Sequence, residues 1–142
     1  MTRERYSVDA EHLLVALTQE AVTYEVRAEP DVDTVDVLPL IIVNPGDGQT
    51  VENQRGMAWV WQTHFSVLAA SHGEASEVAD ELHEKIDSWA DSWDASVGTI
   101  AGVGAITNIE DISLFSRTAT TLTPAGGLTQ FDGTFAITIR KA

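Results

Sequence analysis

The stretch from Ala75 to Trp93 constrains the fold more than any other part of this sequence. Its apolar residues recur at steps of three and four, which places them on one face of an α-helix. They are Ala75, Val78, Ala79, Leu82, Ile86, Trp89, Ala90 and Trp93. The opposite face is acidic, and Lys85 is its only lysine or arginine. Because such an apolar stripe must be buried, we expect this helix to lie on a sheet built from the flanking strands.

A second amphipathic pattern predicts a helix from Tyr6 to Tyr24. Its apolar stripe comprises Ala10, Leu13, Leu14, Leu17 and Ala21, and Thr18 falls outside it. Ser7 or Asp9 can cap the start of this helix, because a short polar side chain accepts bonds from the first free amides. The alternating residues 23–28 can form a short strand after it.

Strand patterns occupy four further segments: Val35–Val43, Met57–Ala70, Ala105–Arg117 and Phe131–Arg140. Pro39 predicts that its end of the first strand lies at a sheet edge or bulge, because proline cannot donate a ladder hydrogen bond. Residues 44–48, Asn-Pro-Gly-Asp-Gly, predict a turn that ends this strand. Residues 94–104 read as a loose connection after the long helix. Apolar residues of mixed phase in 105–117 predict burial on both faces or a bulge.

The order of these elements is helix, strand, strand, helix, strand, strand. It predicts one α+β domain over residues 1–142. We expect two layers, a mostly antiparallel sheet of about four strands covered by two helices. The last two strands are expected to form a hairpin with a long tip.

Charge limits the functions open to this chain. It has 22 acidic residues against 8 lysines and arginines, a net charge of −14. Such a surface repels nucleic acid. Most of these acids are expected to be solvated, although some could line a path along which DNA passes without sticking. The chain has no cysteine, no run long enough to span a membrane and no signal-peptide core, so we expect synthesis in a cytoplasm.

The sequence points to no catalytic, cofactor-binding or metal-binding residue. It lacks phosphate-binding glycine loops and a nucleophile elbow. Its histidines, His12, His64, His72 and His83, show no H-x-x-x-H spacing, so we expect no zinc site and no cofactor. Trp59 and Trp61 share one face of a strand near His64. Such tryptophans are most often core, but the grouping leaves open a pocket between helix and sheet.

Several landmarks together resemble the tail terminator, or tail completion, proteins of long-tailed bacteriophages. They are the N-terminal helix, Leu38-Pro39-Leu40-Ile41-Ile42-Val43 followed by Pro45-Gly46-Asp47-Gly48, the strand Gln62 to Leu68, the helix Glu74 to Ile86, and the final strand Phe131 to Arg140. The resemblance extends over nearly the whole chain as a pattern of elements, and it contains no catalytic residue to carry over.

This resemblance implies a structural virion protein of the tail or neck, assembled in the host cytoplasm. It implies a homo-oligomer, a hexameric ring that caps the tail tube, ends tube polymerisation and meets the head-side connector or head-completion protein. DNA would pass through the lumen without specific binding, and no membrane is involved. The polar segments 44–56 and 118–130 are the expected docking segments.

Two other functions stay open from the sequence. One is a different phage neck or head-closure protein, which would not bind the end of the tube. The other is a small α+β ligand-binding module or enzyme with its pocket at Trp59, Trp61 and His64. A deep cleft with converging ionisable groups would favour that last alternative.

Overall fold

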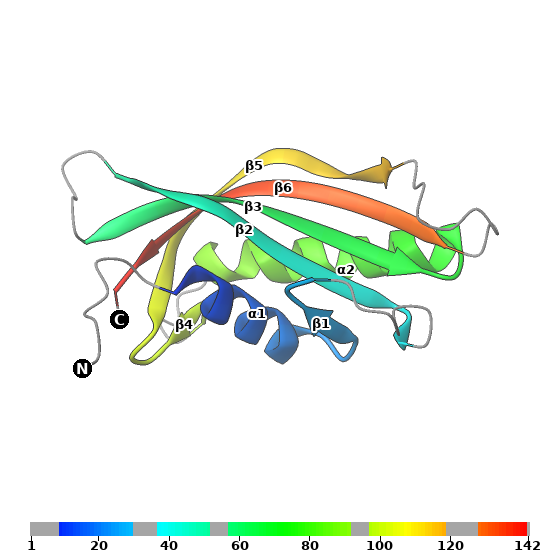
Figure 1. The fold of residues 1–142 in the computed structure, drawn as a ribbon, viewed down its shortest axis with the longest axis horizontal. Helices are drawn as coiled ribbons and strands as arrows, with labels where there is room; N and C mark the ends of the chain where they lie inside the picture. The colour runs from blue at the N-terminus through cyan, green and yellow to red at the C-terminus, as the bar shows by residue number, and fades with distance from the viewer. Residues whose placement is uncertain (1–8, 30–36, 52–56, 92–96, 119–127, 142) are drawn as a thin grey trace.

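The computed structural model describes residues 9–29, 37–51, 57–91, 97–118 and 128–141. Within them the elements are α1 (Ala10–Ala21), β1 (Glu25–Arg27), β2 (Leu40–Thr50), β3 (Ala58–Ala69), α2 (His72–Asp91), β4 (Thr99–Ile100), β5 (Gly104–Thr118) and β6 (Thr129–Arg140). Both helices lie on the same side of one long, twisted sheet (Figure 1). The expected two-layer α+β architecture is therefore confirmed.

The sheet differs in detail from the expected one. It has six strands in the order β1-β2-β3-β6-β5-β4, where about four were expected. The pair β1 and β2 is parallel and every other pair is antiparallel, so the sheet is mixed. The additional strands are the short β1, which was expected only as a possible short strand, and β4, which was expected to be loose chain. The antiparallel pairing of β5 with β6 confirms the predicted hairpin, whose tip lies outside the described residues.

Helix α1 is capped at its start by Asp9, one of the two residues predicted to cap it. The side chain of Asp9 accepts a hydrogen bond from the backbone amide of His12 at 3.1 Å, which satisfies one of the free donors of the first turn. The predicted stripe is buried except for Ala21. Thr18 is also buried, contrary to expectation. Its hydroxyl donates to the Leu14 carbonyl at 2.6 Å, so its polar atom is satisfied inside the helix.

Helix α2 confirms the predicted long stripe. Its buried residues are Ala75, Val78, Ala79, Leu82, Ile86 and Trp89. The expected Trp93 contact lies outside the described residues. The helix starts at His72, within the segment expected to be a turn. The Ser71 hydroxyl accepts from the backbone amide of Glu74 at 3.2 Å and so caps this start.

The core lies between the helices and the alternating faces of β3 and β6. Phe65 and Phe135 are fully buried there, with ring centroids 5.7 Å apart in an edge-on arrangement. Trp59 and Trp61 belong to the same core, each 6% exposed. The alternation read from both strands is thus confirmed, and the tryptophans belong to the packing between sheet and helices.

Strand β2 does not end where the sequence predicted. It continues through Asn44 to Thr50, and the proline and glycines of this segment produce a shift of register between Pro45 and Gly48. A side chain at Gly48 would lie 2.5 Å from the Trp61 ring, so glycine is what lets β2 pass over that indole. Leu40, next to Pro39, pairs with both β1 and β3, so the predicted edge is wrong there.

Candidate interaction surface

The two ends of β5 have different surroundings. Gly104, Ala105 and Ile106 are buried, and the first two pair with β4 as well as lying beside β6. From Thr107 to Thr118 the ladder partners among the described residues come from β6 alone. This second half, which we call the β5 edge, therefore carries a row of backbone groups on its outer side that no described strand pairs with.

The β5 edge is also irregular. Its register against β6 shifts between Ile106 and Asn108, and twice more before Ser116. Each shift changes which side chains face the helices, so the mixed phase seen in the sequence comes from bulges. Burial on both faces, the other explanation, is wrong.

Two large apolar side chains of the β5 edge point into solvent. Ile112 is 51% exposed and Leu114 is 58% exposed. Phe115, which lies inside the last of these register shifts, instead packs against Phe135 with ring centroids 5.7 Å apart. Exposed apolar side chains beside an open strand edge are suited to receive another chain, because strand pairing and apolar burial can then act together.

The sheet face opposite the helices is polar along its middle. His64 is exposed, and its Nδ1 atom lies 2.8 Å from the Thr134 hydroxyl on the neighbouring strand. The Ser66 hydroxyl donates to the Asp132 carboxylate at 2.5 Å. Cross-strand polar pairs of this kind are typical of a solvated or hydrophilic contact face.

The arrangement separates the aromatic grouping that had suggested a pocket. Trp59 and Trp61 face the helices, whereas His64 projects from the opposite face of the same strand. Among the hollows found on the described surface, one of about 550 Å³ lies along α1, lined by Asp9, Glu11, His12, Val15, Ala16, Gln19 and Ala28. None of these residues belongs to the aromatic grouping of Trp59, Trp61 and His64.

The acidic side of α2 influences a residue outside the helix. The Tyr24 hydroxyl donates to the Glu81 carboxylate, and this hydrogen bond, with some burial and the nearby charges of Glu77 and Glu74, raises the pKa of Tyr24 above its usual value. Tyr24 therefore stays neutral and joins the chain before β1 to α2.

Neither of the described helices is long and apolar enough to cross a bilayer.

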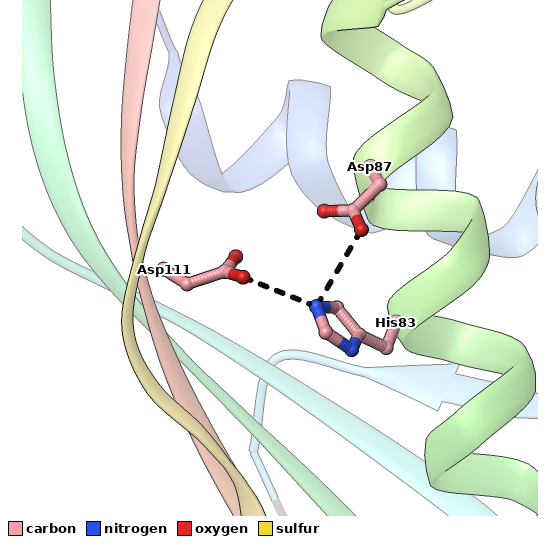
Figure 2. Close-up of side chains that lie close together, drawn as sticks. All are labelled: His83, Asp87 and Asp111. Carbon is pink, nitrogen blue, oxygen red and sulfur yellow. Dashed lines mark ion pairs between the residues drawn. The ribbon is translucent and has the colours of Figure 1, made fainter.

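One group of ionisable side chains does converge. His83 and Asp87 on α2 and Asp111 on β5 point toward one another (Figure 2). His83 Nε2 lies 3.6 Å from the nearest Asp87 oxygen and 3.4 Å from the nearest Asp111 oxygen. The spacing of the histidines in the sequence predicted no metal site, so this group was missed. The i, i+4 spacing of His83 and Asp87 was its only local signal, because Asp111 comes from a distant strand.

Comparisons with known proteins leave the family of this chain open. No protein-family model matches it, and no curated protein matches it. Among solved structures, it is similar to a chain described as "Virion of native gene transfer agent (GTA) particle". The two share 15% sequence identity with a TM-score of 0.43, over 92% of this chain and 87% of that one. A likeness at this level carries no argument about function, so the proposal below rests on the sequence and surface of the chain itself.

Proposed function

We propose that this chain is a structural virion protein whose copies form a closed ring that caps the tail tube of a phage-like particle. The observation that carries the proposal is the β5 edge, which combines backbone groups that no described strand pairs with and the exposed side chains of Ile112 and Leu114. The element pattern that resembles tail terminators supports the same function. The proposal gives the chain no catalytic role and no cofactor.

A closed ring would use the β5 edge differently from a two-fold dimer, in which the same edge pairs with itself. In a cyclic assembly each subunit offers one surface and receives its neighbour on a different one, and closure leaves no edge exposed. The β5 edge would supply the first surface, by strand pairing or by packing of Ile112 and Leu114. The number of subunits, six, comes from the resemblance alone.

The charge of the chain fits a conduit for DNA. A net charge of −14 repels phosphates, so DNA can slide through a lumen formed by such subunits without being held. In this proposal the tail-tube protein binds one face of the ring and the head-side connector or head-completion protein binds the other. The chain resides in the tail or neck of the virion after assembly in the host cytoplasm.

Native mass spectrometry of the purified chain, alone and with the tail-tube protein of its particle, tests this function. We expect a closed oligomer that binds the tube end and halts its growth. Leu114→Asp should abolish the oligomer, because a carboxylate in the subunit contact would be desolvated without a partner. Met57→Asp is the matched control: Met57 is 69% exposed at the opposite end of the sheet, and its variant should assemble normally.

The same experiment separates the competing functions. A ring that forms but ignores tube ends would favour another neck or head-closure protein. A chain that stays monomeric with and without tube protein would refute the ring altogether.

A further inference from the structure

His83 is held in place by aromatic rings with one nitrogen turned toward two carboxylates. Its ring centroid lies 5.6 Å from that of Phe135 and 6.4 Å from that of Phe115. The side chain is 29% exposed, but its Nε2 atom is buried and has no hydrogen-bond partner among the described residues. A buried nitrogen without a partner is costly, so the cluster calls for a group that can satisfy it.

Direct hydrogen bonds do not satisfy this nitrogen. Its contacts with the Asp87 and Asp111 oxygens, at 3.6 Å and 3.4 Å, are longer than the roughly 2.7–2.9 Å of a charge-assisted hydrogen bond. Two carboxylates also face each other across the same small space. Their mutual repulsion opposes this arrangement unless a positive charge lies between them.

The distances match those between ligands of one cation. Nitrogen and oxygen ligands lie about 2.0–2.2 Å from zinc, which in a tetrahedral arrangement separates neighbouring ligand atoms by about 3.3–3.6 Å. The two measured separations from His83 Nε2, 3.4 Å and 3.6 Å, fall in that range. The three ligand atoms all lie within 4.8 Å of one another, and they come from two elements that already pack together.

We propose that His83, Asp87 and Asp111 bind a divalent cation of the zinc class. Imidazole suits zinc and its transition-metal neighbours, whereas magnesium prefers oxygen ligands and retains its water, so one nitrogen and two carboxylates favour zinc. Three protein ligands leave a fourth position for water. The bound cation ties the β5 edge to α2. This site departs from the sequence expectation of no metal, and it does not depend on the proposed ring.

Isothermal titration calorimetry of the whole chain with Zn²⁺, and separately with Mg²⁺, tests the site. We expect one Zn²⁺ per chain and much weaker binding of Mg²⁺. Zn²⁺ at 100-fold above its Kd should raise Tm by about 5–10 °C. Absence of Zn²⁺ binding by the wild-type chain would overturn the proposal, as would equal binding of the two metals.

Matched variants separate this site from general attraction of cations to an acidic surface. His83→Gln and Asp111→Asn should each weaken Zn²⁺ binding at least about tenfold. Glu110→Gln removes the same charge as Asp111→Asn at the preceding, exposed position of the strand, and Glu84→Gln neutralises the exposed acid next to His83 on the helix. Both variants should bind Zn²⁺ as the wild type does. An equal loss of Zn²⁺ affinity in all four variants would refute the site.

NMR of the wild-type chain keeps the test decisive if a site variant does not fold. Addition of Zn²⁺ should shift the His83 ring resonances and the amides around Asp87 and Asp111. Shifts centred on His12, His64 or His72 instead would overturn the assignment.

Discussion

Strands β3 and β5 belong to the same sheet and are both long, with 12 and 15 residues, but they serve different purposes. β3 is central, pairs with β2 and β6 along its length, and alternates regularly between the core and the open face. β5 is regular only at its buried start, and its later half is bulged, exposed and paired on one side among the described residues.

The difference lies in how strongly packing constrains each strand. A central strand gains from every neighbour, so each of its positions is constrained by packing. An edge strand can expose apolar groups such as Leu114 without destabilising the subunit, because a substitution at such a position removes no buried contact. Bulges such as those of β5 twist an edge strand away from simple pairing.

Hydrogen exchange should give the largest contrast between the two strands. Amides of β3 should open only with global unfolding, whereas the outward amides of residues 107–118 lack ladder partners in the described subunit. We expect exchange rates to differ by at least about 10³-fold in the dissociated subunit. Protection of residues 107–118 that appears only when copies of the chain associate would support a subunit contact there. Equal protection of the two strands in the free subunit would contradict the expected difference.

Leu82→Ala tests the helix that covers β3. Leu82 is fully buried, so its truncation should lower the free energy of unfolding by about 2–5 kcal/mol. Urea unfolding measures the change, and Glu84→Ala, at an exposed position on the same helix, should stay within about 0.5 kcal/mol of the wild type. Similar values for the two variants would mean that the packing of this helix is misassigned.

A pair of glycine variants tests how the chain around β4 holds the buried start of β5 in place. Gly98 and Gly102 flank β4 with φ values of 76° and 79°. Alanine at Gly102 meets no atom within 4 Å, so it should cost only the backbone strain of about 1–2 kcal/mol. Alanine at Gly98 would also place its Cβ 2.5 Å from the Trp89 carbonyl oxygen. The Gly98→Ala chain should therefore be less stable than Gly102→Ala in thermal unfolding, and the reverse order would contradict this anchoring.

Leu114→Ala should have the smallest effect on the subunit. Because Leu114 is 58% exposed, we expect its free energy of unfolding to change by less than about 0.5 kcal/mol. Ile137→Ala, in the buried neighbouring strand, should cost about 2–5 kcal/mol in the same denaturant series. A large loss of unfolding free energy from Leu114→Ala in the dissociated subunit would show that the β5 edge is part of the core.

Local patterns were enough to predict much of the fold. The stripe of α2 and the alternation of β3 and β6 were correct in phase, because the repeat of each element follows from its covalent geometry. Residues 44–48 show the limit of local reasoning. Proline and glycine there predicted a turn, but pairing with β3 carries the strand through them with a shift of register.

The apolar faces of α2, β3 and β6 could be predicted from local sequence, because side-chain periodicity is a property of the local backbone. Only the tertiary structure decided that β5 would lie near the sheet edge, with Leu114 in solvent and Asp111 next to His83. Such placements depend on which distant segments pack together, and that choice is made by the free energy of the whole core.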